Sequence, residues 1–184
     1  MGLIIESGTG TGYSAKVNSN NRLTTQSVTV STEHSINHSK GKAFNLMFSA
    51  TPTNGTNPFL YFKNTSDDDI CVERFTLHLV ANEYVDVKLN DTGTPVDGTA
   101  IVPANLNTGS GITATGTFQN ANAITALSGG TIVQRIYHVS SAGEENYNFD
   151  QDIIIKKNGV LTMYIQTGGT ALAGVLIFNY HEKE

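Results

Sequence analysis

The stretch DIIIKKNGVLTMYIQTGGTALAGVLIFNY, residues 152–180, decides the fold class of this chain. It holds three apolar runs of strand length, separated by Asn158-Gly159 and by Gly168-Gly169. An Asn-Gly pair between two apolar runs predicts a β-hairpin, because both residues adopt the left-handed backbone conformation that a tight turn needs. The last run, residues 171–180, is apolar almost throughout, so we expect it to be a central core strand.

Further strand patterns precede this region, with turn residues between them at intervals of roughly 8–12 residues. Their expected bounds are 43–49, 59–63, 70–80, 84–89 and 131–140. Alternation in the longest of these segments separates two faces, and we expect the more apolar face to point into the core. That face carries Cys71, Glu73, Phe75, Leu77 and Leu79.

Residues 90–130 have a looser pattern that is rich in turn residues. Weaker strand patterns occupy residues 100–106 and 112–118. The segment NANAITAL, residues 120–127, is the one place where a short helix is expected. The pattern leaves open whether residues 90–130 form an ordered insertion or a mobile loop.

The body of the chain carries about eight good strand patterns, which is the strand count of a jelly roll. We therefore predict an all-β, jelly-roll-like sandwich of two sheets over residues 33–184. An immunoglobulin-like sandwich is the second choice and a barrel the third. Residues 1–32 are predicted to form an N-terminal arm and hairpin, because a Gly/Thr run leads into two short strand patterns around the polar turn at residues 18–21.

The composition favours β-structure with many loops. Thr, Asn, Gly and Ser together supply 72 of the 184 residues, and charged residues only 15%. Soluble domains usually have about 25% charged residues, and the exposed sides of helices are normally filled with Glu, Lys and Arg. Thr favours strands, whereas Asn, Gly and Ser favour turns.

Charge and motif content argue against several function classes. The net charge is −5 and no cluster of Lys and Arg is present, so nucleic acid is not an expected partner. The longest apolar run, residues 171–178, is too short to span a bilayer, so no membrane partner is predicted. Catalytic and nucleotide-binding signatures are missing, so we predict a protein that is not an enzyme and has no cofactor. The single cysteine, Cys71, excludes an intrachain disulfide and is expected to be buried.

Two acidic segments are candidate calcium sites. Asp67–Asp69 lies beside Asn64 and Ser66, and Asn90–Asp97 is a second loop that is rich in oxygen ligands. Neither matches the alternating ligands of an EF-hand loop, and an acidic turn between strands is commonly just solvated. Both readings stay open. His78 and His138 lie in strand patterns, where they could approach each other across a sheet, but the favoured interpretation is that each is a satisfied or a surface histidine.

Two segments resemble small structural proteins of tailed-bacteriophage virions. They are GTGTGYSAKVNSNNRLTTQSV, residues 8–28, and FLYFKNTSDDDICVERFTLHL, residues 59–79. The resemblance implies a β-rich virion component of the capsid-decoration (cement) or head-fibre type, or a tail accessory protein. Such proteins are commonly trimers that bind an assembled shell. Major capsid protein or other virion proteins would be the partners, and assembly would take place in the bacterial host cytoplasm.

We therefore expect a homo-oligomeric virion protein, with a trimer favoured, that decorates an assembled capsid. Its N-terminal arm would supply the partner-binding residues. These candidates are Leu3, Ile4, Ile5, Tyr13, Lys16 and Arg22. The alternative is a tail or fibre accessory module that binds a host-surface glycan in a pocket lined by tyrosines. The candidates for that pocket are Tyr61, Tyr84, Tyr137 and Tyr147.

Overall fold

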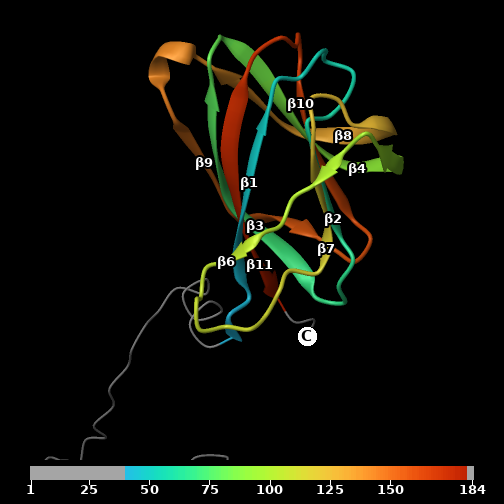
Figure 1. Ribbon diagram of the computed structural model, residues 1–184, viewed down its shortest axis with the longest axis vertical. Coiled ribbons are helices and arrows are strands. Elements are labelled where there is room, and N and C mark those ends of the chain that lie inside the picture. The colour runs from blue at the N-terminus through green and yellow to red at the C-terminus, as the bar shows by residue number, and fades with distance from the viewer. Residues whose placement is uncertain (1–39, 182–184) are drawn as a thin grey trace, which may run out of the picture. The chain divides into compact units, whose positions relative to one another are not determined.

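A computed structural model describes residues 40–181, and two antiparallel β-sheets pack face to face within them (Figure 1). The first sheet contains β1 (Ala43–Ala50), β3 (Asp69–Leu79), β6 (Ala104–Asn105), β9 (Glu145–Ile155) and β11 (Leu172–His181). The second contains β2 (Leu60–Asn64), β4 (Glu83–Val96), β5 (Thr99–Ala100), β7 (Gly116–Asn120), β8 (Thr125–His138) and β10 (Val160–Ile165). One short 3-10 helix, η2 (Ser140–Ala142), precedes β9.

The strand order is that of a jelly roll. The first sheet runs β6-β1-β11-β3-β9 and the second β5-β7-β2-β10-β4-β8. Outside the segment between β4 and β8, eight strands remain, namely β1, β2, β3, β4, β8, β9, β10 and β11. They alternate between the sheets along the chain, except that β4 and β8 belong to the same sheet and pair. The prediction of an all-β, two-sheet jelly roll is therefore confirmed. The predicted boundary at residue 32 lies outside the described residues and stays a prediction.

The segment between β4 and β8 is an ordered insertion that widens both sheets. It places β6 beside β1, and it adds β7 and β5 beyond β2. The weak strand patterns at 100–106 and 112–118 correspond only in part to these short strands. The clearly patterned strands at 43–49, 59–63, 70–80, 84–89 and 131–140 all form, with β4 and β8 extended to 14 residues each.

The predicted Asn158-Gly159 hairpin is wrong, although the turn itself forms. Asn158 has φ 66°, and the N–H of Gly159 donates to the carbonyl of Lys156 at 2.7 Å. The strands on either side, β9 and β10, belong to different sheets. The turn pairs instead with the end of β2: Asn158 N–H donates to Asn64 O at 2.8 Å, and Asn64 N–H donates to Gly159 O at 3.1 Å.

The predicted helix at 120–127 is also wrong. Asn120 ends β7 and Thr125 begins β8. A helix would need each N–H to bond the carbonyl four residues earlier. Here the N–H of Ala121 donates to the Phe59 carbonyl at 3.1 Å, and the N–H of Ile124 donates to Pro58 at 2.9 Å. This pairing buries the Ile124 side chain completely.

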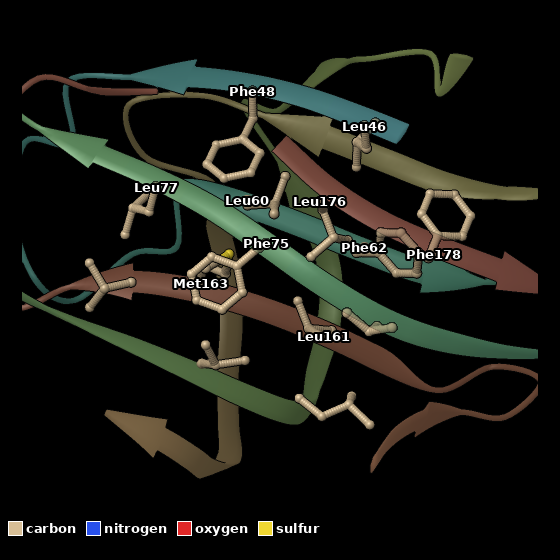
Figure 2. Packing of buried hydrophobic residues seen from close by; sticks show 14 of the residues in the cluster. Leu46, Phe48, Leu60, Phe62, Phe75, Leu77, Leu161, Met163, Leu176 and Phe178 are labelled. Carbon is tan, nitrogen blue, oxygen red and sulfur yellow. The ribbon is translucent and has the colours of Figure 1, made fainter. Parts of the chain in front are cut away.

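The core lies between the two sheets. Figure 2 shows that side chains of both sheets point into this space. Leu46, Phe48, Phe75, Leu77, Leu176 and Phe178 come from the first sheet, and Leu60, Phe62, Leu161 and Met163 come from the second. Phe178 joins the layers, because its ring lies 5.6 Å from that of Phe44 and 4.9 Å from that of Phe62 between centroids. The run at 171–180 is the central strand β11, as expected.

The predicted face of the segment 70–80 is correct only for its second half. Phe75 and Leu77 point into the core, but so do Ile70 and Val72, which are completely buried. The register of β3 against β11 shifts between Val72 and Arg74, so one extra residue in β3 moves the inward face from even to odd positions along the chain. Cys71 is buried, as expected, and forms no disulfide.

Candidate interaction surfaces

The central part of the outer face of the five-stranded sheet is formed by three adjacent rungs, which are rows of residues paired across β1, β11 and β3. These are Ser49–Ala173–His78, Met47–Val175–Thr76 and Asn45–Ile177–Arg74. The side chains point outward because they alternate with residues that point into the core. We call this set the neutral face, because Arg74 is its only Lys, Arg, Asp or Glu.

The centre of the neutral face is apolar and accessible to water. The Met47 side chain is 69% exposed, and Val175 and Ile177 beside it are half-buried. A sheet face that stays in water is normally polar. An apolar centre that lacks charge and has Ser, Thr and Asn around it is typical of a surface that contacts another protein.

A hollow of about 530 Å³ lies along the neutral face. Met47, Ala173 and Val175 contribute apolar surface to it. Polar groups come from Ser49, Thr76, His78, Asn120 and Glu144. The hollow gives this sheet face a recess that side chains of a partner can enter.

His78 of β3 and His138 of β8 belong to different sheets but come close to each other, and only one of them is accessible. Their ring centroids lie 6.2 Å apart. His78 is exposed, whereas His138 is completely buried. Nε2 of His138 lies 3.2 Å from both the N and the O of Leu79, and its Nδ1 lies 3.4 Å from Oε2 of Glu145. His138 therefore links β8 to the end of β3 and to the start of β9.

The second surface is a pair of exposed tyrosines on the six-stranded sheet. Tyr84 of β4 and Tyr137 of β8 face each other directly across the ladder. Their ring centroids lie 4.7 Å apart, with an angle of 46° between the ring planes. Their exposed fractions are 41% and 49%, which leaves much of both aromatic surfaces in contact with water.

The next rung on the same face is an ion pair between Asp86 and Arg135. Nε of Arg135 donates to Oδ1 of Asp86 at 2.6 Å, and Nη2 donates to Oδ2 at 2.8 Å. This hydrogen bonding and the carboxylate charge raise the pKa of the Arg135 guanidinium above its usual value. The Asp86 side chain is only 8% exposed, whereas that of Arg135 is 47% exposed. We call Tyr84, Tyr137, Asp86 and Arg135 the tyrosine platform.

The other two tyrosines proposed for a glycan pocket lie elsewhere. Tyr61 is 2% exposed and packs in a separate cluster with Ile124 and Val160. Tyr147 stacks on Phe75, and its hydroxyl donates to Glu145. Burial, together with Glu145, raises the pKa of the Tyr147 phenol. The structure thus brings together Tyr84 and Tyr137 and separates them from Tyr61 and Tyr147.

The acidic residues of Asn90–Asp97 make hydrogen bonds within the fold. Asp91 is 4% exposed, and its Oδ2 accepts hydrogen bonds from Thr162 Oγ1 at 2.5 Å and from Tyr164 Oη at 2.7 Å. Burial in the first place, and the bond to Asp91, raise the pKa of Tyr164. Asp97 accepts a 2.7 Å hydrogen bond from Thr125. Asp91 therefore connects β4 to β10, and Asp97, which directly follows β4, connects the end of that strand to β8.

The carboxylates of Asp67 and Asp68 point to separate partners. Asp67 lies 2.5 Å from Nζ of Lys157, and Asp68 lies 2.7 Å from Nζ of Lys42. Among residues 40–181, no group of three or more His, Cys, Asp or Glu is placed to hold a metal ion. Within the same range, no helix is long and apolar enough to cross a membrane.

The candidate partner-binding residues of the N-terminal arm all lie outside the described residues, so they stay predictions. They are Leu3, Ile4, Ile5, Tyr13, Lys16 and Arg22. Comparison of the chain with protein-family models, curated proteins and solved structures finds no match.

Sequence reasoning did not single out Met47, Asp86 or Arg135. Met47 lies in a strand pattern whose alternation puts Phe44, Leu46 and Phe48 on one face and Asn45, Met47 and Ser49 on the other, which was the available signal that Met47 points to water. Asp86 and Arg135 are 49 residues apart, and only the register of β4 against β8 makes them neighbours. The alternation in residues 84–89 placed Tyr84 and Asp86 on one face, which was the available signal for half of the platform.

Proposed function

We propose that the protein is a structural component of a tailed-bacteriophage virion that decorates the assembled capsid and contacts other protein subunits through the neutral face. The observation that supports this most is the exposed apolar centre of that face around Met47. The resemblance of residues 8–28 and 59–79 to virion structural proteins points to the same class of protein.

Charge distribution favours protein contact at the neutral face. The chain has a net charge of −5, so two copies repel each other wherever carboxylates meet. The three rungs of the neutral face contain no carboxylate, and Arg74 lies at one side. These rungs can approach a second protein without burying like charges, whereas a partner that enters the hollow must pair or avoid the carboxylate of Glu144.

Co-sedimentation with undecorated phage capsids tests this proposal. Met47→Asp places a charge at the centre of the neutral face, and we expect it to lower capsid occupancy at least about tenfold. Ile132→Asp is the matched control, since Ile132 is an apolar residue of the other sheet that is 44% exposed. The control should bind like the wild-type protein.

Two outcomes contradict different parts of the proposal. Failure of the wild-type protein to sediment with capsids overturns the proposed function. If Met47→Asp binds capsids as well as the wild-type protein does, the neutral face is not the surface that contacts the capsid. Light scattering of the same samples shows whether Met47→Asp dissociates a homo-oligomer.

A second variant that lacks residues 1–12 tests the arm, and we expect it to bind capsids more weakly while its domain stays folded.

A further inference from the structure

We propose that the tyrosine platform is a carbohydrate-binding site for a neutral hexopyranose unit of a glycan. This inference goes beyond capsid decoration and does not depend on it. It starts from two neighbouring rungs on the outer face of the six-stranded sheet: Tyr84–Tyr137 and Asp86–Arg135. The first rung is aromatic and exposed, and the second is a fixed set of hydrogen-bonding groups.

The tyrosine rung suits the apolar face of a sugar ring. An aromatic ring carries negative charge density on its face, and the C–H groups on one side of a pyranose are weakly positive. Tyr84 and Tyr137 keep 41% and 49% of their surface exposed, so ring area is available to a ligand. Their hydroxyl groups add donors and acceptors at the edge of the same surface.

The Asp86–Arg135 rung supplies directed hydrogen bonds without net charge. A guanidinium has five N–H donors, and Asp86 takes two of them. The rest of this half-exposed group is available to sugar hydroxyls. The buried carboxylate of Asp86 compensates the positive charge of Arg135. The rung therefore favours neutral hydroxyl acceptors over a carboxylate or a phosphate.

The platform is held in place before any ligand arrives. The N–H of Tyr84 donates to Oε1 of its neighbour Glu83 at 2.8 Å. The carbonyl of Tyr84 accepts from the N–H of Gln166 at 3.1 Å, which ties β4 to the end of β10. Oε2 of Glu83 also accepts from the N–H of Thr167 at 3.2 Å. Groups that are already ordered lose little conformational entropy when they bind.

The two proposed surfaces lie on the outer faces of different sheets. The neutral face belongs to the five-stranded sheet and the tyrosine platform to the six-stranded sheet. A partner seated on the neutral face therefore leaves the platform accessible, and each proposal can fail without the other.

Binding of the purified full chain to an array of oligosaccharides tests the inference. The array contains neutral probes built from glucose, galactose and mannose, and anionic probes built from uronic acids. The strongest neutral probe is then titrated by calorimetry against four variants. We expect Tyr137→Ala and Arg135→Ala to weaken binding at least about tenfold. Tyr137→Phe, which keeps the ring but removes the hydroxyl, should weaken binding less than Tyr137→Ala does, and Met47→Ala on the other sheet should leave binding unchanged.

Three results would overturn the inference. The first is that no neutral probe binds. The second is that only uronic acid probes bind, because that outcome assigns the platform to an anion. The third is that Tyr137→Ala binds the neutral probe as tightly as the wild-type protein does, because that outcome places the glycan elsewhere. The unfolding midpoint of each variant in urea shows whether a loss of binding reflects a loss of folding.

Discussion

The hydroxyl of Tyr164 donates a 2.7 Å hydrogen bond to Oδ2 of Asp91, a carboxylate that is only 4% exposed. The two residues are 73 positions apart in the chain and lie on β10 and β4. The hydroxyl of Thr162 donates to the same oxygen. A buried carboxylate depends on such donors, because water does not reach it.

Removing one of these donors should therefore destabilise the fold. We expect Tyr164→Phe to lower the free energy of unfolding by about 1–3 kcal/mol, measured by urea denaturation. Tyr137→Phe is the matched control and should change it by less than about 0.5 kcal/mol, because Tyr137 is half-exposed. Equal effects of the two substitutions would contradict the role of Asp91 as an internal link between β4 and β10.

The Gly168-Gly169 turn between β10 and β11 offers a comparison of two glycines. Gly168 has φ 93°, and a Cβ there would lie 2.7 Å from both N and Cα of Asn54. Gly169 has φ 78°, and a Cβ there would meet no atom within 4 Å. We expect Gly169→Ala to cost about 1–2 kcal/mol, from backbone strain alone. Gly168→Ala should cost at least about 3 kcal/mol, because the contact with the backbone adds to the strain. A larger loss of stability for Gly169→Ala than for Gly168→Ala in urea denaturation would contradict this position of the turn.

The sandwich core predicts a large effect at Leu176 of the central strand β11. This side chain is 1% exposed and lies between the sheets (Figure 2). We expect Leu176→Ala to lower the free energy of unfolding by about 2–5 kcal/mol. Leu176→Asp should prevent folding, because it buries an unpaired charge. Met47→Ala, on the outer face of the same sheet, is the control and should stay within about 0.5 kcal/mol of wild type. A normally melting Leu176→Asp variant would exclude this placement of β11.

The thiol of Cys71 should be unreactive in the folded protein. Burial in the first place, and then the charges of Glu73 and Asp69, raise the pKa of Cys71 to about 11. Only the thiolate reacts with disulfide reagents, and at pH 8 about one thiol in a thousand would be ionised. We expect labelling by a disulfide reagent to be slow at pH 8 and to become rapid in urea. Equally fast labelling of the native and the unfolded protein would contradict the buried position of Cys71.

Local sequence signals predicted most of the strands, because apolar runs and turn residues act over a few positions. They did not predict which strands pair. The Asn158-Gly159 signal is a true turn, yet β9 pairs with β3, and β10 pairs with β2 and β4. A short helix was expected at 120–127, but the backbone N–H groups of Ala121 and Ile124 donate to the carbonyls of Phe59 and Pro58 instead. In both places, contacts between distant segments decided the structure.

The same limit applies to the candidate surfaces. Tyr84 and Tyr137 were identifiable as tyrosines in strand patterns, but nothing local showed that they are neighbours while Tyr61 is buried. The ion pair between Asp86 and Arg135 depends on the register of β4 and β8, which contains two irregularities. The alternation in β1 is enough to place Met47 on the outer face, but nothing local shows that Val175 and Ile177 of β11 lie beside it.

Hydroxyl-radical footprinting of the capsid-bound protein tests the central claim most directly. Met47, Tyr84 and Tyr137 are all exposed and oxidisable in the free protein, whereas Met163 is completely buried and serves as an internal reference. Docking through the neutral face predicts that Met47 becomes protected on capsids while both tyrosines stay reactive. Protection of Tyr84 and Tyr137 with Met47 still reactive would contradict the account, because it would assign the capsid contact to the tyrosine platform.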